Sequence, residues 1–122
     1  MITGVVNPDR EAVIRLKIYG VGGQVLEIDV VIDTGFTGSL TLPPHLVATL
    51  QLPFYNRQQV ILGDGNIHSL DVHTGTIDWE GQPRRIEINV ADTTPLAGMN
   101  LMYGYKLTIE DVDGGAVLIE VL

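Results

Sequence analysis

The sequence predicts an all-β fold, arranged as a small, closed or strongly curved barrel. Short runs rich in Val and Ile recur along the chain, and several alternate apolar with polar residues as half-buried strands do. Turn-forming stretches that contain Gly, Asp or Asn separate these runs. By contrast, "PPHLVATLQ" (43–51) has the early prolines and the apolar spacing of a short helix.

The expected strands follow one another in chain order. They are "AVIRLKIYG" (12–20), "QVLEIDVVID" (24–33), "QVILG" (59–63), "IHSLDVHTGTIDW" (67–79), "RRIEINV" (84–90), "KLTIEDV" (106–112) and "AVLIEVL" (116–122). Asp64-Gly65 lies between two of these runs and predicts the tip of a β-hairpin. A second short helix is expected after Gly98, in "GMNLMYG" (98–104), so that one or two short helices accompany the strands.

Length and composition indicate a single domain over residues 1–122 with a core that needs no metal or disulfide. The formal charge of −8 disfavours a nucleic-acid partner, because phosphate contacts need a basic patch. No apolar run approaches the ~20 residues of a membrane span, and the first residues lack the pattern of a signal peptide. The chain has no cysteine, which fits a reducing compartment, so a cytoplasmic protein without a membrane partner is expected.

A carboxylate follows an apolar run in "VVIDTGFTGSLTLPP" (30–44), where Asp33 begins the sequence Asp33-Thr34-Gly35. An ionised carboxylate beside a hydrophobic strand is costly unless it is paired or protonated. Gly35 allows a sharp turn, and the Thr34 hydroxyl can brace it. The tripeptide alone is weak evidence, but the apolar strand before it and the small residues after it favour a functional carboxylate.

An internal echo relates "LEIDVVIDTG" (26–35) to "IEINVADTTP" (86–95), since each strand ends in Asp-Thr and a turn. A duplicated half-domain and a chance likeness between two strands both account for it. The echo also suggests Asp92 as a second carboxylate within one chain. Thr94-Pro95 stands there in place of the glycine that aims such a side chain, so a solvated loop is the preferred interpretation for Asp92.

Three features, in chain order, resemble the retropepsin-like family of aspartic proteases. The first is the apolar strand with Asp33-Thr34-Gly35, and the second is "VILGDGNIHSL" (60–70), which is similar to the family's flap hairpin. The third is "PLAGMNLMYG" (95–104), which resembles the family's apolar-apolar-Gly step. The resemblance extends from about Val13 to Val121. Two residues depart from it: Phe36 stands where many relatives carry Ser or Ala, and Ala97 where Ile or Leu is common.

This resemblance implies a closed barrel of the retropepsin type and an aspartic endopeptidase that needs no cofactor and no metal. Such enzymes use two carboxylates that share a proton. Because this chain has one Asp-Thr-Gly, the resemblance implies a homodimer in which each chain supplies Asp33 and Thr34 reaches toward its partner. The implied catalytic residues are Asp33, Thr34 and Gly35. Residues 60–68 would form a flap over an extended peptide or protein substrate, with contacts from Phe36, Ile61, Leu62, Gly63, Asp64, Gly65, Ile67, Leu96, Ala97 and Gly98.

Two other interpretations stay open. One is a catalytically silent, dimeric peptide-binding module of the same fold, although such a module gains nothing from a costly buried carboxylate pair. The other is a plain β-barrel with an accidental motif. No metal site is expected, because the histidines are scattered and the acidic cluster at 110–113 lacks the regular oxygen spacing of an EF-hand.

Overall fold

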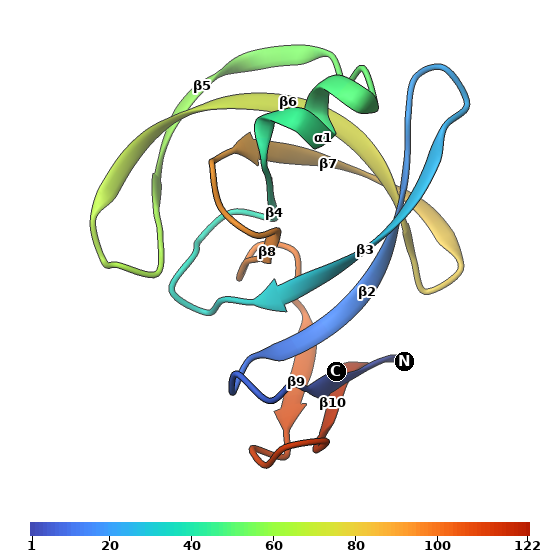
Figure 1. Cartoon of the computed structure of the whole chain (residues 1–122), viewed down its shortest axis with the longest axis vertical. Helices are drawn as coiled ribbons and strands as arrows, with labels where there is room; N and C mark the ends of the chain where they lie inside the picture. Colours follow the sequence, from blue (N-terminus) through green and yellow to red (C-terminus); the bar gives the residue numbers. More distant parts are fainter.

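The computed structural model describes all residues 1–122, and the protein is all-β, as predicted (Figure 1). The elements are β1 (Ile2–Val6), β2 (Ala12–Tyr19), β3 (Val25–Ile32), β4 (Leu40–Leu42), α1 (Pro44–Thr49), β5 (Phe54–Ile61), β6 (Ile67–Trp79), β7 (Gln82–Val90), β8 (Leu96–Ala97), β9 (Tyr105–Ile109) and β10 (Ala116–Val121). The strands form one sheet in the order β5-β6-β7-β4-β8-β3-β2-β1-β10-β9. None of the helical structure is long and apolar enough to cross a membrane.

Strands β2, β3, β7 and β10 begin and end within two residues of their predicted limits, and β6 has the predicted bounds. Strand β5 begins five residues before the predicted run 59–63, and β1 was not predicted. The helix predicted in 43–51 is α1, which begins with a proline in its first turn. The prediction of a second helix in 98–104 is wrong, because this segment forms successive turns. Its first backbone N–H groups bond to carbonyl groups of residues 36–39, and Gly104 leaves helical geometry with a φ of +88°.

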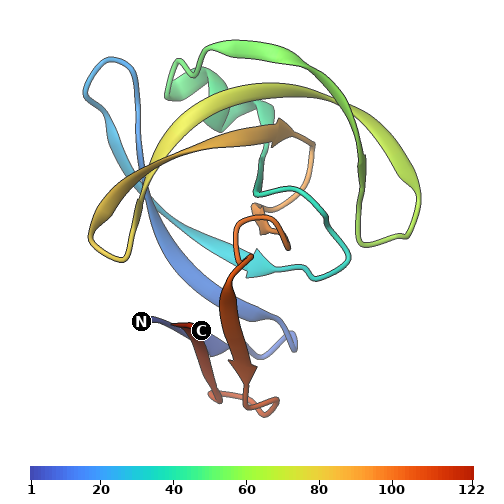
Figure 2. The same ribbon diagram turned by 180° about the vertical axis from the view of Figure 1, so that it is seen from behind.

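In the centre of the sheet, the two strands that carry the sequence echo, and the short strands that follow them, pair in equivalent ways. Strand β3 pairs in parallel with β8, and β7 pairs in parallel with β4. The two short strands β4 and β8 then pair with each other in antiparallel fashion. Strands β3 and β7 are the two echoing strands, and each is followed by a loop that leads into a short strand (Figures 1 and 2).

A cluster of buried apolar side chains fills the space inside the curved sheet. It includes Ile18 from β2, Leu40 from β4 and Ile77 from β6, all fully buried. Burial of each such side chain contributes about 1.5–3 kcal/mol. Strand β2 also pairs with β6 through Ile18 and Ile77, so residues far apart in the sheet order meet around this core.

Two hairpins project from the core region, and one of them reaches the candidate site. The hairpin of β5 and β6 projects from the sheet, and its tip approaches the loop after β3 in both views of the ribbon (Figures 1 and 2). At the other end, β9 and β10 extend as a second hairpin, with β10 paired to β1 and β9 at the sheet edge. The chain termini lie close together on this second extension (Figure 1).

Candidate active site

Asp33 follows the last residue of β3 and is held in a hydrogen-bonded turn. Its backbone N–H donates to the Ala97 carbonyl oxygen at 2.9 Å, which continues the parallel pairing of β3 with β8. The carboxylate atom Oδ1 accepts a hydrogen bond from the Gly35 N–H at 2.9 Å, and the Phe36 N–H donates to the Asp33 carbonyl at 3.1 Å. The side chain is half-buried. The turn therefore fixes one carboxylate oxygen and leaves Oδ2 without a hydrogen-bond partner.

The segment after β8 is joined to the Asp33 loop by backbone hydrogen bonds. The N–H groups of Gly98, Met99 and Asn100 donate to the carbonyl oxygens of residues 39, 36 and 38 at 3.0, 2.9 and 3.0 Å. The Asn100 side chain also donates to Ser39 Oγ at 2.9 Å. The structure thus places residues 98–100 directly beside the Asp33 loop.

Phe36 lies underneath this loop. Its side chain is 0% exposed, and its ring packs on the backbone at Gly38 and Gly98. A Cβ added to Gly38 would lie 2.5 Å from Phe36 Cζ, and a Cβ added to Gly98 would lie 2.5 Å from Phe36 Cδ2. The predicted substrate contacts of Phe36, Ala97 and Gly98 are not available in this structure, because all three residues are buried beneath the loop that they support.

The hairpin of β5 and β6 reaches the same loop from the other side. The Thr37 N–H donates to the Ile61 carbonyl oxygen at 3.2 Å. A Cβ added to Gly35 would lie 3.0 Å from Gly63 Cα, and a Cβ added to Gly63 would lie 2.8 Å from Asp33 Oδ2. The structure therefore brings the hairpin tip directly against the Asp33 carboxylate.

The hairpin tip has hydrogen bonds of its own. The Gly65 N–H donates to the Leu62 carbonyl at 2.9 Å, and Gly65 has the positive φ of +78° that glycine favours. Asp64 Oδ1 accepts from the Asn66 N–H at 2.8 Å, and Asp64 Oδ2 lies 2.9 Å from His68 Nε2. The Asn66 backbone N–H, followed by His68, holds the pKa of Asp64 below its usual value of 3.8.

The remaining predicted residues differ in their exposure. Thr34 is exposed, and Leu62 and Leu96 are partly buried. Ile61 and Ile67 face each other across the hairpin and are 43% and 67% exposed, so the hairpin presents apolar surface next to its tip.

Asp92 is exposed in a bend between β7 and β8. The hydrogen bonds of Asp33 are all to backbone groups, and none of them joins it to Asp92.

Sequence reasoning missed the roles of Thr37, Ser39 and Asn100, which join the Asp33 loop to the hairpin and to the segment after β8. In the sequence, the only features that could have indicated these roles are a run of small residues after Asp33 and an asparagine after Gly98. Two of these contacts use backbone atoms of Thr37 and Asn100. Side-chain identity carries no information about such contacts.

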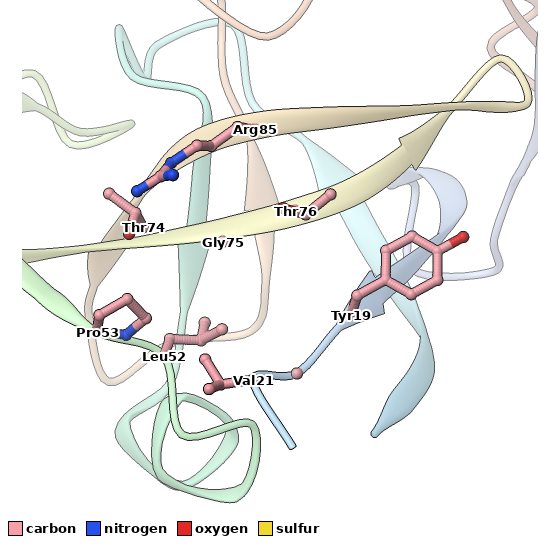
Figure 3. A pocket seen from close by; sticks show the side chains of 9 residues that line it. Tyr19, Val21, Leu52, Pro53, Thr74, Gly75, Thr76 and Arg85 are labelled. Atoms are coloured by element: carbon pink, nitrogen blue, oxygen red, sulfur yellow. The ribbon is translucent and has the colours of Figure 1, made fainter. Parts of the chain in front are cut away.

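A polar cavity adjoins the Asp33 loop, between residues 37–39 and β5. Its lining includes Gln58 and Gln59 from β5 and Glu87 and Asn89 from β7. A different cavity lies between the β2–β3 turn and β6, around Tyr19, Val21, Leu52, Pro53, Thr74 and Arg85 (Figure 3). It shares no residue with the Asp33 loop and contains no carboxylate. No group of three or more His, Cys, Asp or Glu side chains is placed to hold a metal ion.

Comparison with known proteins finds no matching family model, no matching curated protein and no matching solved structure. The function is therefore inferred from the residues of the site and their geometry.

Proposed function

We propose that this protein is a cytoplasmic, homodimeric aspartic endopeptidase with a closed barrel of the retropepsin type. The observation that carries the proposal is the convergence of three separate segments on one carboxylate. The Asp33 turn, the hairpin tip at Gly63 and the segment that begins at Gly98 are linked by hydrogen bonds and direct contact. The pairing of β2 with β6 supports the closed barrel, and the absence of cysteine fits the reducing cytoplasm.

The state of the carboxylate suits pairing with a second copy. Oδ1 is held by the Gly35 N–H, whereas Oδ2 has no hydrogen bond within the chain. A two-fold axis beside Oδ2 would bring the two Asp33 side chains together, and carboxylates about 3 Å apart share one proton. Thr34 is exposed, which leaves its side chain accessible to such a partner. A twofold-symmetric dimer is the commonest oligomer and needs only one site residue from each chain.

In this arrangement the ionised Asp33 accepts a proton from a water molecule, and the oxygen of that water molecule attacks the scissile carbonyl carbon. The protonated Asp33 of the partner donates its proton to the carbonyl oxygen, which gives a tetrahedral diol. The Asp33 that took the proton from water then donates it to the amide nitrogen, while the partner's Asp33 takes a proton from one hydroxyl of the diol. The C–N bond breaks, an amine and a carboxylic acid leave, and the pair again holds one proton. No bond forms between the enzyme and its substrate.

The surroundings of Asp33 favour a peptide bound as an extended strand. Exposed Ile61 and Ile67 supply apolar contacts from the hairpin, and the polar cavity beside Thr37 can take a hydrogen-bonding side chain. Extended peptides bind along exposed strands through backbone hydrogen bonds, and side-chain pockets set their specificity.

Cleavage of a mixed peptide library, at pH values from acid to neutral, tests the proposal. We expect cleavage by the wild-type protein, loss of cleavage in Asp33→Asn, and inhibition by a statine-type mimic of the tetrahedral intermediate. A wild-type protein that binds peptides and cleaves none of them over this range would instead be the silent binding module. Cleavage that survives Asp33→Asn would contradict the proposed mechanism.

A further inference from the structure

The polar cavity beside the Asp33 loop contains a buried amide without a partner. Asn89 on β7 lines this cavity and is only 2% exposed. Its Nδ2 is buried and has no hydrogen-bond partner within the chain. A buried donor that stays unpaired costs about 1–3 kcal/mol. The Asn89 amide therefore needs a hydrogen-bond acceptor, and the cavity is the space from which a ligand can supply one.

A carboxylate lines the same cavity beside this amide. Glu87 precedes Asn89 by two residues on β7, so the two side chains extend to the same face of the strand. Glu87 Oε2 accepts a hydrogen bond from Gln58 Nε2 at 3.3 Å, whereas Oε1 has no hydrogen bond and the carboxylate forms no ion pair. The cavity thus offers one unpaired donor and one unpaired acceptor.

The cavity has the size and the position of a subsite for one side chain. Its volume is about 220 Å³. This is larger than the ~30 Å³ of one water molecule and smaller than the roughly 300–1,000 Å³ of a pocket that encloses a whole drug-sized ligand. Residues 37–39, which continue the loop from Asp33, form one wall of the cavity. The Thr37 N–H also donates to the Ile61 carbonyl, so the cavity adjoins the point where this loop meets the hairpin.

The unpaired donor and acceptor together favour a neutral carboxamide. The side chains of glutamine and asparagine have a carbonyl oxygen that can accept from Asn89 Nδ2 and an NH₂ group that can donate to Glu87. A carboxylate would pair with Asn89 but would be repelled by Glu87. A lysine or arginine side chain would pair with Glu87 and leave Asn89 unpaired, and an aliphatic side chain would leave both unpaired.

We propose that this cavity is a specificity subsite for a glutamine or asparagine side chain of the peptide substrate, with Asn89 and Glu87 as its specificity-determining residues. The inference rests on the proposed function, because it names the class of peptide that is cut at Asp33. A peptide bound as an extended strand presents every second side chain to the same face. One carboxamide residue near the scissile bond therefore enters the cavity.

A peptide library in which each position is varied among glutamine, asparagine, glutamate, lysine and leucine tests the subsite in two ways. Mass spectrometry identifies the bonds that the wild-type protein cleaves, and it identifies the peptides that Asp33→Asn retains without cleavage. We expect glutamine or asparagine to be favoured about tenfold at one position in both experiments. The factor is modest because Glu87 and Gln59, which also line the cavity, are exposed.

Glu87→Gln shows whether the preference arises in this cavity. The variant loses the negative charge, so peptides with glutamate should be retained within about threefold of those with glutamine. Because Glu87 is exposed, the variant should fold normally. Glu120→Gln on β10 is the matched control, since it makes the same change outside the cavity and should keep the wild-type preference. An unchanged preference in Glu87→Gln would overturn the proposal.

NMR of the Asn89 side chain gives a direct measurement of binding. The assigned NH₂ resonances of Asn89 should shift when a retained glutamine peptide is added, and they should stay in place with the leucine analogue. Equal shifts with both peptides would contradict the proposed hydrogen bond.

The outcomes for the subsite and for the proposed function are distinguishable. Cleavage without a preference for glutamine or asparagine at any position would overturn the subsite and leave the endopeptidase intact. Selective retention of carboxamide peptides without any cleavage would disprove the endopeptidase and leave the subsite intact. If the protein neither cleaves peptides nor retains them selectively, both proposals are wrong.

Discussion

Replacement of Gly98 by alanine should disrupt the support of the Asp33 loop from a buried position. The new Cβ would overlap the Gly38 carbonyl oxygen and would lie 2.8 Å from the Phe36 carbonyl oxygen. Both obstacles are backbone atoms, which cannot rotate away as the end of a flexible side chain does. The segment after β8 must therefore separate from the loop.

The magnitude follows from the contacts that this separation breaks. Three backbone hydrogen bonds join residues 98–100 to residues 36–39. At roughly 1 kcal/mol net for each bond, Gly98→Ala should reduce the free energy of unfolding by about 3 kcal/mol. Peptide cleavage should fall as well, because the same bonds hold the backbone on which Asp33 turns.

Urea unfolding followed by the fluorescence of Trp79, the only tryptophan, provides the assay, since this residue is buried. All variants should be compared at one protein concentration, because the proposed dimer would stabilise the folded state in a concentration-dependent way. Gly22→Ala is the matched control, since its added Cβ meets only the flexible end of Gln24 in an exposed turn. The control should stay within about 0.5 kcal/mol of the wild type. The same small change in Gly98→Ala would refute the reasoning.

Three further predictions concern the site. Phe36→Ala should lower the free energy of unfolding by about 3–5 kcal/mol in the same urea assay, and a loss below about 1 kcal/mol would show that the ring does not support the loop. The pKa of the Asp64 carboxyl, followed by NMR, should lie below 3.8, so that its stabilising effect is present at neutral pH and is lost as the pH falls through that lowered value; His68→Ala should raise it, and a wild-type value above 3.8 would contradict the structure. Asp33→Asn should reduce the cleavage rate about 10²–10⁴-fold while Asp92→Asn cleaves normally, and an inactive Asp92 variant would point to a dyad within one chain.

Much of the fold was predictable because alternation of apolar and polar residues identifies strands with one buried face. Strand β6 shows this pattern at both ends, with Leu70 and Val72 near its start and Ile77 and Trp79 near its end, and its limits were predicted correctly. Strands β4 and β8 have three and two residues, too few to show any period, so their central pairing was not predictable. The segment 98–104 has helix-compatible residues, but hydrogen bonds to the Asp33 loop hold it in turns.

The three segments that form the candidate site could be predicted from the sequence, but the side-chain contacts between them could not. The motif order placed Asp33, the hairpin and Gly98 in one site, and the structure joins them. The role of Phe36 was not predictable, because an aromatic residue beside a carboxylate looks like a substrate-facing wall in the sequence. Only the packing of its ring on glycine backbone shows that it supports the loop from inside.

The distance between the two Asp33 carboxylates in an assembled complex tests the central claim most directly. A crystal structure of the protein with a statine-type peptide mimic would measure it. We expect the two side chains to meet across a two-fold axis at about 3 Å, with the peptide between them and the two hairpins. Two Asp33 side chains that point away from each other into solvent, or a mimic bound to a single chain, would contradict the account.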